Sequence, residues 1–420
     1  MMAGVVQVSG QTTMNLEECR NKAVDFNKQL KIAGYQEQEA MAQKKATFTS
    51  YLPTFSADAN FMHLMDMEDL NIGGMPISMD NLSLAYGGLS MAQPLYAGGK
   101  IMAANDMAKA GLDIAGFAYD LKYSEVIELT DKAFWNVALL EANIELAEKY
   151  IEMLTELEEQ ITAMYDVGLQ PASEKLRVSV QKNEADLQLM IARNSLKLAK
   201  MNLNQVIGYE LEMDIQIHYG PLDDLQLFDL SNGERLAQEN RNELKILCKK
   251  IDFAEYDKKM INADYLPQLG VGFQYMGSWI ENFREDITFN PTVVAQLTIP
   301  IFQWRQGYHK RNAADFKIKQ AITELNDTKD LVNLQVLNVK VKVEEAYEAI
   351  LIATKNIAEA EESLEETKAS FEVGLNSTTD LLNAQTDWLT AKVQQLRAVA
   401  NYKVLETSWK KVTGRLSPVK

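Results

Sequence analysis

The feature that most limits how this chain can fold is that its sequence repeats itself. Pro94 and Pro300 lie 206 positions apart, and the same interval separates Gly168 from Gly374. The N-terminal parts of the two copies match at a second interval, 214 positions: Tyr51-Leu52-Pro53 and Tyr265-Leu266-Pro267. Several matches at fixed spacing indicate a duplicated structural unit. Whatever one copy forms, the chain therefore contains twice.

Each copy is predicted to run helix, strand, strand, very long helix, turn, helix, so the chain is mainly α with β. The first copy covers 13–208, with strands at about 54–62 and 84–93, a long helix at about 99–165 and a helix at about 172–207. The second covers 232–414, with strands at about 268–276 and 292–299, a long helix at about 307–371 and a helix at about 378–413. We expect 1–12 to be a signal remnant or disordered N-terminus, 209–231 an equatorial connector and 415–420 a C-terminal tail.

The long helices carry the pattern of a supercoil. Ala346, Ile350, Ala353 and Ile357 recur at alternating steps of four and three, which is the 3.5-residue repeat of a coiled coil. Roughly 65 residues at 1.5 Å each give a rod of about 100 Å. A short glycine turn then joins each rod to the next helix as an antiparallel hairpin. The pattern is typical of a solid bundle or of a ring of helices around a lumen, and the heptads alone favour the solid bundle.

The strands favour the ring. Their residues alternate between an apolar and a polar set, and four strands are too few to close a barrel. Three chains would supply twelve strands, with the apolar side outward and the polar side inward, as in a membrane barrel that contains water. A soluble β-sandwich is the alternative. Aromatic residues at the helix end of the strands predict a girdle at the membrane interface: Tyr51, Tyr96, Tyr265, Phe302 and Trp304.

Composition limits the function further. The net charge of −17 and pI near 4.8 argue against nucleic acid as a partner. No stretch approaches the ~18 apolar residues that a membrane-spanning helix needs. The three histidines are scattered, and the two cysteines fall in helical patterns, so we predict no metal and no cofactor. Without a phosphate-binding loop or a nucleophile elbow, an enzyme is not expected.

The order of these parts resembles the TolC family of outer-membrane channels. The resemblance rests on Tyr-Leu-Pro before the first strand of each copy, on Gln93-Pro94-Leu95-Tyr96 and Ile299-Pro300-Ile301-Phe302 after the second, and on the two Val-Gly-Leu turns. It implies a homotrimer with a twelve-stranded β-barrel in the lipid of the outer membrane and a long α-helical barrel across the periplasm. It also implies export of drugs, small molecules or proteins together with a periplasmic adaptor (membrane fusion) protein and an inner-membrane RND or ABC transporter.

The resemblance also assigns residues to the periplasmic tip. The two turns would contact the adaptor: Val167, Gly168, Leu169, Val373, Gly374 and Leu375. Residues beside them would narrow the aperture: Asp380, Asn383, Phe371, Asn376, Ser173 and Glu174. Asn383 stands where the family has an acidic residue, so the ring at the aperture is expected to be less charged. Phe371 and Asn376 stand where the family has a tyrosine and an arginine, so the closed state is expected to use other pairs. Three of these residues also have a simpler interpretation, with Gly168 and Gly374 as helix caps and Asp380 as a helix N-terminal carboxylate.

Two other classes of function are open to such a sequence. A coiled-coil scaffold of the cell envelope would use the same heptads without forming a pore. A soluble pore-forming toxin would use the same strands but convert on contact with a membrane. Conductance of the purified protein separates these classes, because a scaffold conducts nothing and a toxin inserts from solution.

Overall fold

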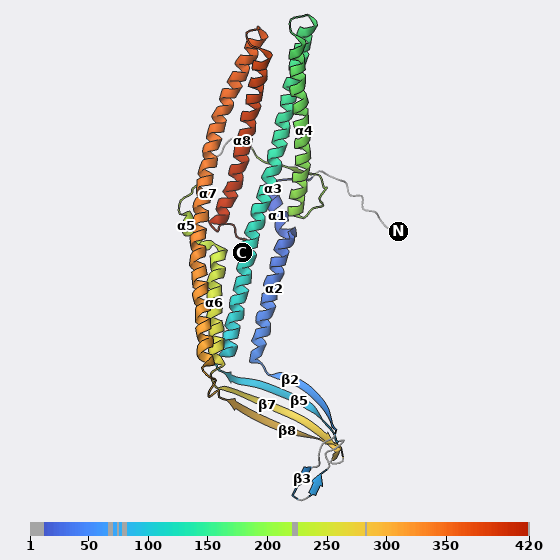
Figure 1. Cartoon of the computed structure of the whole chain (residues 1–420), viewed down its shortest axis with the longest axis vertical. Coiled ribbons are helices and arrows are strands. Elements are labelled where there is room, and N and C mark those ends of the chain that lie inside the picture. The colour runs from blue at the N-terminus through green and yellow to red at the C-terminus, as the bar shows by residue number, and fades with distance from the viewer. Residues whose placement is uncertain are drawn as a thin grey trace, which may run out of the picture. The chain divides into compact units, whose positions relative to one another are not determined.

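The structure is a computed structural model that describes residues 12–65, 70–73, 75–77, 82–220, 226–281 and 284–418 (Figure 1). The expected N-terminal signal remnant falls almost wholly outside the described residues. The helices are α1 (Leu16–Phe26), α2 (Lys28–Phe48), α3 (Lys100–Asp166), α4 (Ala172–Ile207), α5 (Gly233–Asn240), α6 (Asn242–Ala263), α7 (Gln306–Glu372) and α8 (Thr378–Val412). The strands are β1 (Thr12–Met14), β2 (Thr54–Leu64), β3 (Leu70–Ile72), β4 (Met75–Ile77), β5 (Leu82–Ala97), β6 (Ile215–Ile217), β7 (Gln268–Ile280) and β8 (Arg284–Thr298).

The chain divides into two compact units. The sheet unit comprises residues 36–116 and 246–326, and the helical unit comprises 1–35, 117–245 and 327–420. The sheet unit therefore holds β2, β5, β7 and β8 with the parts of the helices next to them. The helical unit holds both hairpins, α3–α4 and α7–α8, and their turns. None of the helices among the described residues has a stretch long and apolar enough to cross a membrane.

The predicted duplication is confirmed in the backbone. Helices α3 and α7 are each 67 residues long. Both copies break their first helix at the same place, because Asn27 and Arg241 lie 214 positions apart and have nearly the same φ and ψ, −60° and 122° against −60° and 124°. The sequence predicts one continuous helix before the first strand, and that expectation is wrong. The Asn27 side chain accepts hydrogen bonds from the backbone N–H groups of Gln29 and Leu30, so it starts a new helix there.

The sheet separates an apolar face from a polar one. Its antiparallel strands lie in the order β2-β5-β7-β8, so β2 and β8 are its outer strands. One row across all four strands is Phe55, Met91, Phe273 and Val293, and the next is Ser56, Ser90, Gln274 and Thr292. Phe55 and Val293 are 75% and 78% exposed. The apolar face is thus open rather than packed inward, as the sandwich alternative would require.

The last two strands are longer than the sequence predicts. Residues 277–290 are acidic and begin with a glycine, which favours a loop, and the structure instead extends β7 to Ile280 and begins β8 at Arg284. Cross-strand pairing explains the difference. Gly277 lies opposite Phe289, and the Phe289 ring covers the space where a side chain at Gly277 would lie. Pairing with an aromatic neighbour compensates for the weak strand preference of glycine.

The helical unit is held together by an apolar core and a polar junction. The core packs Phe134 and Val137 of α3 against Leu203 and Ile207 of α4. In the polar junction, Arg20 of α1 donates two hydrogen bonds to Asp131 of α3, 2.7 and 2.5 Å long, and Thr407 of α8 donates another to the same carboxylate. The Asp131 side chain is fully buried. The junction therefore ties the first helix of copy one to the last helix of copy two.

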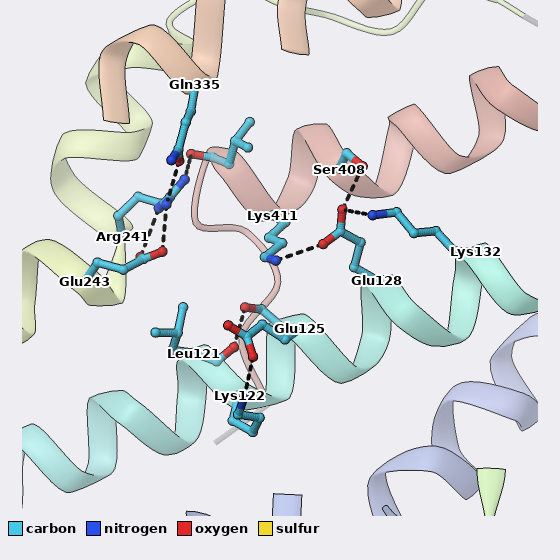
Figure 2. Close-up of polar contacts among 12 residues, drawn as sticks. Leu121, Lys122, Glu125, Glu128, Lys132, Arg241, Glu243, Gln335, Ser408 and Lys411 are labelled. Atoms are coloured by element: carbon cyan, nitrogen blue, oxygen red, sulfur yellow. Dashed lines mark hydrogen bonds and ion pairs between the residues drawn. The ribbon is translucent and has the colours of Figure 1, made fainter. Parts of the chain in front are cut away.

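A second carboxylate completes the polar junction (Figure 2). Glu128 of α3 accepts hydrogen bonds from Lys411 and Ser408 of α8, 2.8 and 3.0 Å long, and pairs with Lys132 at 2.9 Å. Burial opposes ionisation of Glu128, but the bonds from the two lysines outweigh it and lower its pKa to about 2. Glu128 is therefore ionised at neutral pH within the α3–α8 interface.

Candidate functional site at the hairpin tips

Both hairpin turns of the helical unit end their first helix with the same cap. Gly168 donates to the carbonyl of Tyr165 and Leu169 to that of Met164, at 2.9 and 2.8 Å. Gly374 and Leu375 make the equivalent bonds to Phe371 and Ser370, at 3.0 and 2.9 Å. This pair of bonds is the Schellman motif, and it needs the positive φ of glycine, here 79° and 77°. The two glycines are therefore helix caps, as their simpler interpretation predicts.

The caps project apolar side chains into solvent. Val167, Leu169, Val373 and Leu375 are 70–80% exposed. A Cβ built on Gly168 or Gly374 would meet no heavy atom within 4 Å. Each turn thus presents two aliphatic side chains on either side of a glycine with open space above it. This surface suits a partner whose backbone approaches closely, because glycine has no side chain to block it. The cap does not prevent such a contact, since capping uses the backbone of the turn and the contact would use its exposed side chains.

Asp380 lies in the first turn of α8 and is one half of a capping box. Ser377 donates to its carboxylate from the backbone N–H at 2.9 Å and from the hydroxyl at 2.6 Å, and the Asp380 N–H donates back to the Ser377 hydroxyl. These bonds from Ser377 lower the pKa of Asp380. The side chain is exposed and ionised at neutral pH. Asn383 is also exposed, one turn further along α8.

The other four residues expected at the aperture occupy different environments. Phe371 is 4% exposed and packs in a core cluster with Tyr150, Ile161, Val178 and Leu381. Its side chain is therefore buried, and it stabilises the hairpins from inside. Ser173 is exposed, whereas Glu174 and Asn376 are half-buried.

The structure joins the two hairpins near their tips through residues that the sequence interpretation missed. Arg177 of α4 donates to the hydroxyl of Thr379 of α8 at 2.8 Å and lies 3.7 Å from Glu174. Glu174 is thereby connected, through Arg177, to the residue next to Asp380. The Glu174–Arg177 pair has the i, i+3 spacing of a helical ion pair, and this spacing was the signal available in the sequence. Its link to Thr379 joins residues 202 positions apart and leaves no local pattern.

The five residues of the expected girdle lie in the sheet unit and differ in exposure. Trp304 and Phe302 are 85% and 68% exposed, and their rings meet edge to face with centroids 5.0 Å apart. Tyr51 and Tyr96 are about half exposed. Tyr265 is half-buried, because its ring lies against Gly307 at the start of α7. Four of the five thus present an aromatic surface, and the fifth also supports the helix.

Comparison with known proteins decides the family. The sequence model of the family described as outer membrane efflux protein matches residues 20–209 and 235–415. The chain belongs to the outer membrane efflux protein family. The match leaves out residues 210–234 between the two copies. The family is one of outer-membrane transport proteins, and the predicted resemblance to TolC-like channels is confirmed.

Solved structures of bacterial membrane proteins share the fold. The Campylobacter jejuni CmeC outer membrane channel is 18% identical, with a TM-score of 0.82 over 99% of this chain and 91% of that one. A membrane protein from Pseudomonas aeruginosa is 15% identical, with a TM-score of 0.83 over 95% and 93% of the two chains.

The alkaline protease secretion protein AprF of Pseudomonas aeruginosa is 24% identical over 269 residues, which are 60% of this chain. That match spans about half, 53%, of the curated relative's length.

Proposed function

We propose that three copies of this chain assemble into a passive exit channel, with a twelve-stranded β-barrel in the outer membrane and a helical barrel in the periplasm. The observation that carries the proposal is the four-stranded sheet. Among the described residues its two outer strands, β2 and β8, have one edge each left for pairing, and its apolar and polar rows lie on opposite faces. Joining β8 of one copy to β2 of the next satisfies both edges and gives a wall with an apolar outside.

The helical unit supports the same assembly. Within one chain α3 packs on α8, and Tyr150 of α3 bonds Thr386 of α8 at 3.2 Å. Helices α4 and α7 lie on the outer sides of this pair (Figure 1). Each carries exposed aliphatic side chains at heptad-like spacing: Leu176, Val180, Leu187, Ile191 and Leu198 on α4, and Leu334, Val341 and Ile352 on α7. Packing α4 of one copy on α7 of the next would cover both stripes.

The tips would then serve as the gate and the docking surface of this channel. Three exposed Asp380 carboxylates around one axis would attract cations to the aperture. The exposed Val167, Leu169, Val373 and Leu375 would contact a periplasmic adaptor that links the channel to an inner-membrane RND or ABC transporter. Transport is driven by that pump, so the chain itself performs no enzymatic step and needs no cofactor.

Conductance in a planar lipid bilayer tests the channel. The purified protein, extracted from outer membranes in detergent, should form trimers by native mass spectrometry and conduct ions. Leu187→Glu should abolish trimers by placing a charge in the α4 stripe. Gln188→Glu introduces the same carboxylate on the next residue, which lies about 100° around the helix from Leu187 and is exposed, and should leave trimers intact. A wild-type protein that forms no pore would favour the scaffold and refute the proposal, whereas insertion from detergent-free solution would favour the toxin.

The aperture is tested in the same assay. Trivalent cations added on the periplasmic side should block the wild-type channel, and Asp380→Ala should weaken that block. Asp387→Ala, which removes an exposed acidic residue two turns further along α8, is the matched control. Equal block in wild type and Asp380→Ala would remove Asp380 from the aperture while leaving the channel proposal intact.

A further inference from the structure

The two copies differ at the turn where the sheet joins the long helices. In the first copy, Gly98 and Gly99 precede α3 with φ of 61° and 84°. At the 206-residue interval the second copy has Trp304 and Arg305, with φ of 48° and 60°, just before α7. Glycine enters this left-handed region without strain, whereas a residue with a Cβ does so at a cost. The second copy therefore holds two large side chains in a conformation that glycine provides freely in the first.

The contacts that these side chains make within the chain do not explain the strain. The Trp304 ring meets Phe302 but remains 85% exposed, and the neighbouring Ile301 is 92% exposed. The Arg305 guanidinium lies 5.4 Å from the centre of the Tyr308 ring and makes no ion pair with any described residue. Arg305 also immediately precedes α7, where the positive end of the helix dipole disfavours a cation. A strained, exposed aromatic–cation pair is more readily explained by a ligand outside the chain.

The position of the turn indicates the ligand. Strand β8 ends at Thr298, so the turn lies at the end of the apolar sheet face, where Leu297 is 60% exposed. Tryptophan favours the boundary between hydrocarbon and headgroups, and the arginine fork matches the oxygens of a phosphate. The first copy has a lysine, Lys100, in the corresponding region, but it is paired with Asp264 at 2.7 Å. Of these two turns, both of which the structure describes, the second alone offers an unpaired cation beside an exposed indole.

We propose that Trp304 and Arg305 form a binding site for the headgroup of a membrane phospholipid. The indole lies at the level of the glycerol esters, and the guanidinium binds the phosphate. The site occurs once per chain, at the second of the two sheet-to-helix turns. It rests on the proposed function, because it requires the sheet unit to be embedded in a membrane.

Lipid titration of the full-length protein in dodecyl maltoside tests the site. The probe is dioctanoylphosphatidylglycerol, and the readout is its affinity from native mass spectrometry. Arg305→Gln should weaken binding about fivefold, the equivalent of about 1 kcal/mol for one basic side chain at an anionic lipid surface. Lys319→Gln is the matched control, because it removes the same charge from an exposed side chain that also lies 5.4 Å from an aromatic ring, Phe316, about 20 Å further along α7. The control should bind like wild type.

A double variant separates the site from a structural role. Trp304→Gly with Arg305→Gly reproduces the turn of the first copy, so its thermal midpoint without lipid should equal or exceed that of wild type. The stabilisation that the lipid gives to wild type should be lost. Inorganic phosphate at the same concentration should stabilise neither protein, because it lacks the glycerol esters and acyl chains that the indole would contact.

Three results would overturn the inference. These are equal lipid affinity in Arg305→Gln and Lys319→Gln, a double variant that keeps its lipid response, and stabilisation by inorganic phosphate alone. Bilayer conductance of the wild-type protein is measured in parallel. If the protein conducts and the lipid results are negative, the headgroup site is wrong and the channel stands. If it neither conducts nor inserts, the proposed function itself has failed.

Discussion

Replacing Glu128 by glutamine should destabilise the helical unit in a pH-dependent way. This carboxylate lies in the polar junction between α3 and α8, where Lys411, Ser408 and Lys132 surround it. Glutamine keeps the shape and one acceptor oxygen but removes the charge. The two lysines then lose their shared partner, while the apolar core nearby is untouched.

The magnitude follows from the pKa. Burial raises the pKa of Glu128, but the bonds from Lys132 and Lys411 lower it from 4.5 to about 2. At about 1.36 kcal/mol per pKa unit, the ionised form contributes roughly 3 kcal/mol, or about 2 kcal/mol after allowing for solvent screening of a side chain that is 15% exposed. Because the folded pKa lies below the unfolded one, this stability is present above about pH 4.5 and is lost as the pH falls towards about 2.

Chemical denaturation between pH 7 and pH 3 measures the effect at a fixed protein concentration. Trp409, which is 1% exposed and lies two residues before Lys411, provides a fluorescent probe of the junction. Glu128→Gln should lose about 2 kcal/mol of unfolding free energy at pH 7 and less than half of that at pH 3. Glu125→Gln is the control on the same helix, where an exposed ion pair with Lys122 contributes at most about 0.5 kcal/mol. Equal losses in both variants, or a loss independent of pH, would refute the reasoning.

Three further predictions concern single contacts. Asp131→Ala should cost about 3–5 kcal/mol of unfolding free energy, because it leaves the half-buried Arg20 without its partner. In a thermal melt, the double variant Arg20→Ala/Asp131→Ala should regain part of that loss. Gly374→Ala should lower the unfolding free energy by about 1 kcal/mol, which is the strain of an alanine in the left-handed region. Gly208→Ala should lower it clearly more, because φ is similar there but the added Cβ would lie 2.4 Å from the Phe26 Cβ. Ser377→Ala should lose about 1 kcal/mol through the α8 capping box and weaken cation block by less than Asp380→Ala, and equal effects on block would favour a purely capping role for Asp380.

The sequence predicted those features that local patterns determine. Alternation in residues 54–62 and 268–276 predicted strands that the structure has, because side chains on a pleated strand alternate between faces. Val-Gly-Leu predicted both hairpin turns, because the Schellman cap requires glycine at one position. The break at Asn27 was also readable, since asparagine competes with the helix backbone, but the surrounding helical composition hid it.

Features that depend on distant partners could not be predicted in this way. The Arg20–Asp131 bond joins residues 111 positions apart, and the Thr407–Asp131 bond joins residues 276 apart. In the sequence all three are ordinary polar residues within helical patterns. Phe371 is a case in which a local position was misleading. Its place beside the turn predicted a role at the aperture, but the side chain is buried against Tyr150 and Leu381, which are distant in sequence. The positions of the remaining tip residues relative to a pore axis stay a prediction, because that axis exists only in the assembly.

The energetics of the tip lead to a last prediction about the adaptor. Val167, Leu169, Val373 and Leu375 are 70–80% exposed, and burying each contributes about 1.5–3 kcal/mol, so one chain offers roughly 6–12 kcal/mol in all. Association costs about 4–15 kcal/mol before any net affinity appears. One chain's tip is therefore marginal, and stable docking requires tips from more than one chain. Leu187→Glu, which leaves every tip residue unchanged, should then abolish adaptor binding in a pull-down together with the trimer, whereas Gln188→Glu should keep both. Full adaptor binding by a monomeric Leu187→Glu protein would contradict this reasoning. It would indicate that contacts outside the two turns provide most of the binding free energy.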